Sequence, residues 1–178
     1  MITNNFDIIV SNVEEKIDKK LTPMEQVKNL ACIKAKTVFN DTKGQGDRIV
    51  IGSDTIVVKD GKIYGKPKNH DEALAMLREL RNDRYEVMTG LCIISEKDGK
   101  VEENIDVDIT SVYINDVKDD ELEEWIATNE AYDKAGAYAI QGKFGVFIDR
   151  IEGNYFTVVG LPIHKVYNAI KNLIWGGV

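Results

Sequence analysis

Residues 133–142 combine side chains that suit the binding of a phosphorylated ligand. The segment holds the acid–base pair Asp133 and Lys134, two glycines and the amide of Gln141, separated by small or aromatic residues. Lysine pairs with phosphate, glycine lets the backbone approach a ligand closely, and an amide can bond to the edge of a base. A tight strand turn with a surface ion pair explains the same residues. The segment therefore leaves two alternatives open, a nucleotide pocket or a turn.

Lys34 falls on the apolar face of a predicted helix. We expect a helix from Thr22 to about Phe39, because the segment opens with a threonine N-cap, a proline at the first helical position and a glutamate that completes a capping box. Three apolar residues share the face of Lys34 at helical spacing: Val27, Ala31 and Val38. A lysine at this position extends to solvent, finds a counter-charge or reaches into a cleft.

Asp54 interrupts an apolar segment that is typical of a β-strand. The apolar run 49–52 precedes it, and the β-branched run 55–58 follows it directly. An aspartate could form a turn here, but the immediate return of strand-forming residues argues against an ordinary one. Because a charge within a buried strand is costly unless it is paired or bound to a metal, the position favours a functional role for Asp54.

Three further candidates are polar residues beside predicted strands or turns. Lys66 lies between a glycine that opens its loop and a proline that stiffens it, although a solvated surface lysine is the common alternative. Glu14 follows an extended segment, where an acid is ordinarily solvated. Thr55, like Gln141, can donate and accept hydrogen bonds, which suits the edge of a pyrimidine and equally suits local backbone groups.

The composition is that of a soluble globular protein. The chain has 178 residues, of which 43% are hydrophobic and 30% charged, and this suits one domain with a real core. No segment is long enough to span a membrane and the first residues lack the pattern of a signal peptide, so we expect a cytoplasmic protein without a membrane partner. The net charge of −7 argues against nucleic acid as a partner. Cys32 and Cys92 are expected to be buried small hydrophobes.

The elements that must position these residues alternate between strands and helices. We expect strands over residues 6–10, 48–58, 85–95, 101–117 and 144–151, with hairpin turns at Asp60–Gly61 and Asp98–Gly99. We expect helices over residues 22–39, 71–80 and 119–128, and a last helix that Pro162 opens. This mixture predicts an α/β or α+β class with a mixed sheet.

Five motifs occur together in the order and at the spacing of a known family. They are Ser11–Glu15, Gly52–Thr55, Tyr64–Pro67, Asp133–Gly142 and Val159–Pro162. The last four lie in the patterns G-[AS]-D-T, G-K-P, D-K-A-G-x-Y-x-I-Q-G and V-x-G-L-P, of which the last begins at Val158. From about Phe6 to about Ile170 the chain resembles the Maf (septum formation) nucleotide pyrophosphatases. The resemblance implies a Maf/ITPase-like α/β fold, a twisted mixed sheet flanked by helices, with two lobes around a deep cleft.

The resemblance implies the catalytic and metal-binding roles. Asp54 occupies the place of the family's catalytic aspartate, a proton acceptor or metal ligand. Glu14 matches the acid that would hold Mg²⁺ or Mn²⁺ together with Asp54, since hard cations prefer oxygen ligands. Lys34 matches a site lysine of the family, and the counterpart of Lys66 contacts phosphate.

The resemblance also implies how the substrate is bound. Lys134 would offset phosphate charge, with Asp133 as its orienting partner. At Thr55 and Gln141 the chain resembles the family branch that is selective for dTTP and UTP. We therefore predict a pyrophosphatase that hydrolyses these nucleoside triphosphates to the monophosphate and pyrophosphate. The alternatives are a non-catalytic nucleotide-binding or regulatory protein and an adaptor linked to septum formation, and a homodimer is left open.

One family motif has no counterpart in this sequence. The family opens with a strand and an S-x-S-x-R-R loop, whose serine and arginine line the phosphate end of the site, and S-x-S-x-R-R occurs nowhere in this chain. We therefore expect a single Maf-like domain over residues 1–178 that is N-terminally incomplete relative to the family, and a correspondingly weaker activity.

Overall fold

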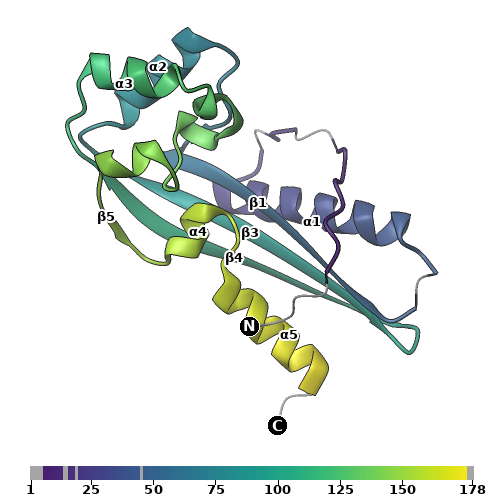
Figure 1. Ribbon diagram of the computed structural model, residues 1–178. Coiled ribbons are helices and arrows are strands. Elements are labelled where there is room, and N and C mark those ends of the chain that lie inside the picture. The colour runs from purple at the N-terminus through teal and green to yellow at the C-terminus, as the bar shows by residue number, and fades with distance from the viewer. Residues whose placement is uncertain (1–5, 14–15, 19, 45, 176–178) are drawn as a thin grey trace. The chain divides into compact units, whose positions relative to one another are not determined.

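The computed structural model describes residues 6–13, 16–18, 20–44 and 46–175 (Figure 1). The strands form a five-stranded sheet in the order β2-β1-β3-β4-β5. They are β1 (Arg48–Lys59), β2 (Lys62–Tyr64), β3 (Arg84–Lys97), β4 (Lys100–Ile114) and β5 (Ile148–Glu152). The α-helices are α1 (Pro23–Asp41), α2 (His70–Leu80), α3 (Asp119–Ile126), α4 (Tyr155–Val159) and α5 (Ile163–Trp175). The described residues also include the 3₁₀ helices η1 (Glu130–Asp133), η2 (Ala135–Ala137) and η3 (Lys143–Phe147).

Hairpin geometry sets the strand directions. β1 and β2 pair antiparallel, with Val57 opposite Tyr64, and the turn Asp60–Gly61 has the positive φ angles that a tight hairpin needs. β4 and β5 also pair antiparallel, with Val112 opposite Ile151. The predicted α/β combination of a sheet with flanking helices is confirmed. Both pairs whose register the structure gives are antiparallel, where a sheet of mixed direction was expected.

The chain divides into two compact units. The first comprises Met1–Asp54, Gly90–Val107 and Leu161–Val178, and the second Thr55–Thr89 and Asp108–Gly160. The deep cleft and the single domain that were expected from the sequence stay predictions. Within the described ranges, no helix combines the length and the apolar character that crossing a bilayer requires.

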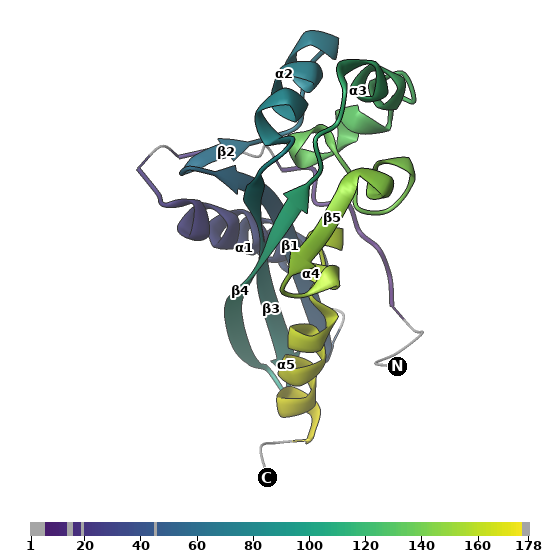
Figure 2. The same ribbon diagram turned by 90° about the vertical axis from the view of Figure 1, so that its left-hand side faces the viewer.

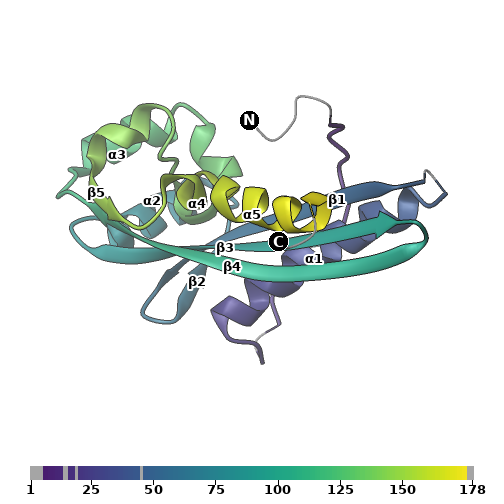
Figure 3. The ribbon, with the colours of Figure 1, turned by 90° about the horizontal axis from the view of Figure 1, so that it is seen from below.

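In the first unit, helices α1 and α5 cover opposite faces of the strands (Figure 3). The alternation of side chains along β3 explains this, because neighbouring residues of a strand point to opposite faces. Cys92 and Ile94 pack against α1, through Ala31, Cys32 and Ala35. Leu91, the residue before Cys92, points to the other face and packs against Val166 and Ile170 of α5.

Helix α1 lies directly on the strand backbone, and two glycines make this close approach possible. A Cβ atom added to Gly52 would lie 2.4 Å from the carbonyl oxygen of Ala31, and one added to Gly90 would lie 2.5 Å from that of Val27. Real Cβ atoms do not approach backbone so closely. The start of the helix follows the sequence prediction, with Thr22 and Glu25 bonded reciprocally in a capping box.

In the second unit, α2 and α3 lie side by side (Figure 2). Their apolar faces join one cluster with strand residues and with the 3₁₀ segments, which includes Val57, Tyr64, Leu77, Leu80, Tyr85, Val112, Leu122, Trp125, Tyr138 and Phe144. Burial of this set stabilises the loops that connect the helices, since each large apolar side chain contributes roughly 1.5–3 kcal/mol.

Most predicted elements are confirmed to within a few residues of each boundary. The prediction of a strand at Phe6–Val10 is wrong: this segment has no regular secondary structure, and Phe6, Ile8 and Val10 are exposed. Its β-branched composition favours a strand, but a strand also needs a hydrogen-bonded neighbour, and none pairs with it among the described residues.

The predicted strand over residues 144–151 is only partly correct. Residues Lys143–Phe147 form η3, and β5 begins at Ile148. Gly142, with φ +95, sets a backbone conformation that does not belong to a strand. The predicted end of the preceding strand, residue 117, is also three residues beyond the observed end of β4 at Ile114. Helix α4 was missed, although Asn154 caps it and Gly160 ends it with φ +109.

Candidate active site

Lys34 and Asp54 form the central ion pair of the first unit. The Nζ atom of Lys34, on α1, lies 2.5 Å from Oδ1 of Asp54, on β1. Asp54 is 8% exposed, and β1 continues through it without a turn. Lys34 therefore finds a counter-charge instead of extending freely to solvent. Asp54 lies within a strand and does not form a turn.

This arrangement places the carboxylate of Asp54, a proton acceptor, beside the ammonium group of Lys34. A buried carboxylate requires a partner, since its desolvation would otherwise cost several kcal/mol. Lys34 supplies that partner from a helix that Gly52, two residues before Asp54, holds against the strand. An aspartate so placed can accept a proton or coordinate a cation, and the lysine can offset the charge of a phosphate.

The second unit contains a group of two lysines around one acid. Lys66 Nζ lies 2.9 Å from Oδ1 of Asp133, and Lys134 Nζ lies 3.3 Å from its Oδ2. The hydrogen bond from Lys66 is the main cause that holds the pKa of Asp133 below its usual range, followed by that from Lys134. All three side chains are partly or largely exposed, so the lysines are accessible to an anionic ligand.

Backbone geometry joins the loops that carry these lysines. The N–H of Gly136 donates to the carbonyl of Gly65 at 3.0 Å, so the G-K-P and D-K-A-G motifs meet in space. Gly136 has φ +68, and a Cβ there would lie 3.2 Å from side-chain atoms of Val57 and Leu80. Only glycine therefore fits this position without strain. The indole of Trp125 fixes the next turn by donating to the carbonyl of Ala137.

Thr55 belongs to a partly buried hydrogen-bond network in the second unit. Its Oγ1 lies 2.9 Å from Oγ1 of Thr89, which donates to the carbonyl of Thr157 at 2.7 Å. The hydroxyl of Thr157 in turn donates to Asp108. The sequence reasoning did not identify the last three residues. A threonine within an apolar strand was the only signal for Thr89, and no local pattern indicates partners so distant in the sequence.

Two predicted residues remain, Gln141 and Glu14. Gln141 is exposed and lies three residues after Tyr138, where the buried segment ends. Glu14 lies outside the described residues. The roles predicted for Glu14, Lys34, Asp54, Lys66, Thr55, Asp133, Lys134 and Gln141, and their meeting at one ligand, stay predictions.

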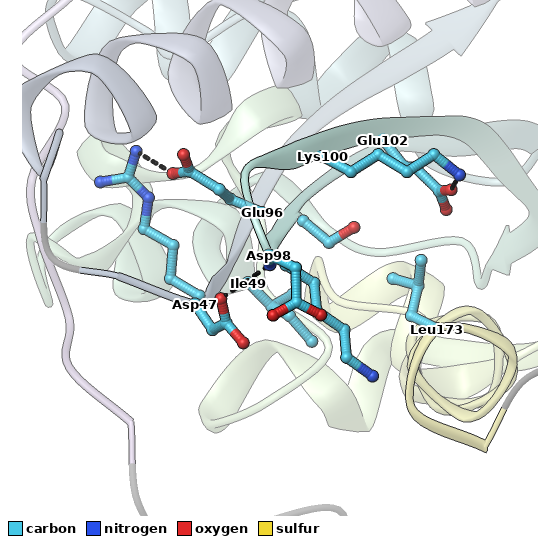
Figure 4. Close-up of a pocket in the computed structure, with 10 residues that line it drawn as sticks. Asp47, Ile49, Glu96, Asp98, Lys100, Glu102 and Leu173 are labelled. Atoms are coloured by element: carbon cyan, nitrogen blue, oxygen red, sulfur yellow. Dashed lines mark hydrogen bonds and ion pairs between the residues drawn. The ribbon is translucent and has the colours of Figure 1, made fainter.

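A pocket in the first unit holds none of the predicted site residues (Figure 4). It has a volume of about 530 Å³ and lies around the turn of the β3–β4 hairpin, next to Leu173 of α5. Arg48 pairs with Glu96 at 2.8 Å and Lys100 with Glu102 at 2.5 Å. The lining has more acidic than basic side chains, so the pocket has little attraction for a triphosphate.

Comparison with known proteins decides the family. A family model described as "Maf-like protein" matches residues 1–173. The chain belongs to the Maf family.

Three relatives of this Maf protein share one name. A protein named dTTP/UTP pyrophosphatase from Alkaliphilus oremlandii (strain OhILAs) is 47% identical over 167 residues, which cover 94% of this chain and 84% of that protein. Its namesake from Alkaliphilus metalliredigens (strain QYMF) is 48% identical over 161 residues, covering 90% and 81%. A third, from Caldicellulosiruptor saccharolyticus (strain ATCC 43494 / DSM 8903 / Tp8T 6331), is 41% identical over 169 residues, covering 94% and 84%.

Proposed function

We propose that this Maf protein is a pyrophosphatase that hydrolyses dTTP and UTP to the nucleoside monophosphate and pyrophosphate. The names of its relatives support this activity and these substrates. The observation that carries the proposal is the contact between Lys34 and Asp54, which places a nearly buried carboxylate beside an ammonium group at the motif positions of the family. Such a pair combines a proton acceptor with a group that stabilises phosphate charge.

The predicted residues would take distinct parts in the proposed chemistry. Asp54 accepts the proton of the attacking water if it is not a ligand of the metal ion, and Lys34 offsets the charge that develops on the phosphate. Lys66 and Lys134 bind phosphate oxygens as point charges, with Asp133 orienting both ammonium groups. Gln141 is exposed and available for the base edge, whereas the Thr55 hydroxyl already pairs with Thr89.

A divalent cation, Mg²⁺ or Mn²⁺, fits the donor chemistry of Asp54. Carboxylate oxygens are the ligands that hard cations prefer, and Glu14 would supply the second one. When bound, the ion would neutralise part of the charge on the triphosphate. Lys34 would then offset the charge of the bound phosphate as well as that of Asp54.

Turnover of dTTP by matched variants tests the proposal. Asp54→Asn keeps the shape of the side chain but cannot accept a proton as a carboxylate does, so pyrophosphate release should fall by roughly 10²–10⁴-fold. The control is Asp60→Asn in the exposed β1–β2 turn, which should keep wild-type activity. Release of pyrophosphate and thymidine monophosphate in equal amounts is expected from wild type and control.

Two results would contradict the proposal. Wild-type turnover by Asp54→Asn would remove this residue from the mechanism. Thermal stabilisation of the wild type by dTTP without any product would instead favour the non-catalytic nucleotide-binding alternative.

We also propose a cytoplasmic location and assembly as a homodimer. Two free cysteines that are both buried suit a reducing compartment. Light scattering on the purified chain tests the dimer, and a monomer mass at assay concentrations would overturn it.

A further inference from the structure

A cluster of two cysteines and one glutamate lies in the first unit and includes neither Lys34 nor Asp54. Cys32 is on α1, Cys92 on β3 and Glu103 on β4, so three separate elements each contribute one side chain. The two Sγ atoms and one carboxylate oxygen of Glu103 all lie within 4.8 Å of one another. Side chains that far apart in the sequence converge here because α1 packs on the face of the strands that carries Cys92.

The spacing of these atoms is close to that of ligands around a tetrahedral zinc ion. Cys92 Sγ lies 3.6 Å from Oε1 of Glu103. With Zn–S bonds of about 2.3 Å and Zn–O bonds of about 2.0 Å, tetrahedral geometry separates sulfur from oxygen by about 3.5 Å and sulfur from sulfur by about 3.8 Å. An ion could therefore be accommodated with small side-chain movements.

The cluster is buried on the side of the cysteines and reaches solvent on the side of Glu103. Cys32 is 8% exposed and Cys92 is fully buried, while the side chain of Glu103 is 33% exposed. On the exposed side, Lys36 Nζ lies 2.9 Å from the same glutamate oxygen. Lys36 is largely exposed and can turn to solvent, which would open a path to the thiols. Two buried cysteines alone would be ordinary core residues, and the carboxylate beside them is the additional feature.

We propose that Cys32, Cys92 and Glu103 bind one Zn²⁺ ion, with water as the fourth ligand. Sulfur ligands select Zn²⁺ over the harder Mg²⁺ and Mn²⁺, so this site differs in metal preference from the one proposed at Asp54. The bound ion ties α1 to β3 and β4. Both thiols lose a proton to solvent when their sulfur atoms bind the ion.

Proton release makes the affinity depend on pH. The sulfur atoms of Cys32 and Cys92 bind the ion as thiolates. Two protons must leave as Zn²⁺ binds, and affinity should therefore increase with pH. Mg²⁺ should not compete, because it does not favour thiolate ligands.

The test is a Zn²⁺ titration of the full chain, reduced with a phosphine, in competition with a chromophoric chelator. One ion per chain is expected, and Co²⁺ in its place should give the visible bands of a tetrahedral thiolate site. Zn²⁺ should also protect both cysteines from a thiol reagent. Glu103→Gln and Cys92→Ser should each weaken binding at least about tenfold, since even loss of a group behind a ligand costs 10–100-fold.

Matched variants keep the outcome clear. Glu102→Gln alters the neighbouring exposed carboxylate, which pairs with Lys100, and should bind Zn²⁺ as tightly as wild type. Glu103→Gln changes a partly exposed side chain, so it tests the site even if Cys92→Ser does not fold. Asp54→Asn should retain Zn²⁺ binding, which separates this site from the proposed catalytic one.

Three results would overturn the inference. The first is the absence of saturable binding by the wild type. The second is equal affinity in wild type and Glu103→Gln, which would remove the glutamate from the site. The third is loss of binding in Asp54→Asn, which would place the ion elsewhere.

Discussion

At the scale of single residues, the ion pair of Lys34 and Asp54 bears on both the stability of the fold and the proposed function. A charge in the middle of a β-strand persists only if its desolvation is compensated, and here the compensation comes from a helix twenty residues earlier in the chain. The same requirement makes the pair informative about function, because a carboxylate held beside an ammonium group is set for proton or metal chemistry.

A double-mutant cycle should reveal the coupling between these two residues. Lys34→Met removes the ammonium group but keeps the apolar stem, and we expect it to lower the free energy of unfolding by about 1–3 kcal/mol because a nearly buried charge loses a partner. Lys34→Met combined with Asp54→Asn should be less destabilised than the two single effects predict, with a coupling of about 0.5–3 kcal/mol. Urea denaturation measures all four variants.

An exposed ion pair supplies the comparison for this cycle. Lys62 and Glu79 lie 2.5 Å apart and are about half exposed, so solvent screens them and their coupling should stay below about 1 kcal/mol. If the effects of the Lys34 and Asp54 changes simply add, the ion pair does not stabilise the fold in the way described.

At the scale of elements, the contact of α1 with the strands depends on glycine. Gly52→Ala should lower the free energy of unfolding by about 1–3 kcal/mol, because the new Cβ would overlap the backbone of α1 at Ala31 and Ala35. Gly65→Ala is the matched control, since nothing lies within 4 Å of the added atom. Thermal or urea unfolding compares the two, and equal stability would show that α1 can shift away without cost.

Helices α2 and α3 are linked by a contact that depends on pH. His70 Nε2 lies 2.5 Å from a carboxylate oxygen of Glu123, and this hydrogen bond, followed by one to Asp71, raises the pKa of His70. A raised pKa in the folded state means that the stabilisation is complete below the unfolded value of about 6.5 and is lost as pH rises through the folded value.

NMR titration of the imidazole signals should therefore place His70 above its ordinary pKa. Glu123→Gln should return that pKa toward the ordinary value and remove the corresponding decrease in stability above about pH 6.5. Asp71→Asn should have a smaller effect, because Asp71 is the second and more distant partner at 3.4 Å. A His70 pKa that does not respond to Glu123→Gln would contradict this account.

The sequence predicted the elements better than it predicted the connections between them. Lys34 was found through helical spacing and Asp54 through a break in an apolar run, and both are local patterns. The hydroxyl network of Thr89 and Thr157 joins residues 68 positions apart, for which no local pattern exists. The 3₁₀ segments were missed because positive φ angles at Gly136 and Gly142 interrupt strand-like composition. The convergence of Cys32, Cys92 and Glu103 likewise depends on how α1 packs.

At the scale of the whole molecule, charge balance determines how the protein meets its proposed substrate. The chain carries a net charge of −7, and a triphosphate is itself strongly anionic. The net negative charge of the protein therefore repels the triphosphate, and binding requires cations close to the phosphates. Lys66 and Lys134 provide such a group in the second unit, and a divalent cation would add to it. We therefore expect nucleotide to bind and stabilise the protein only when the two lysines and the divalent cation are present.

Thermal unfolding with a dTTP analogue that cannot be cleaved between the α- and β-phosphates tests this balance. A ligand at one hundred times its Kd adds about 2.7 kcal/mol of stability, and Tm of a domain of this size rises by about 2–4 °C per kcal/mol, so a shift of about 5–10 °C is expected with Mg²⁺. Chelation of Mg²⁺ should remove most of the shift, because the charge of the triphosphate is then opposed by lysines alone. Lys66→Met should reduce the shift as well, whereas Lys62→Met, which removes an exposed lysine paired with Glu79, should not. Equal shifts in Lys66→Met and wild type would show that Lys66 does not contact the ligand, and equal shifts with and without Mg²⁺ would show that the lysines suffice.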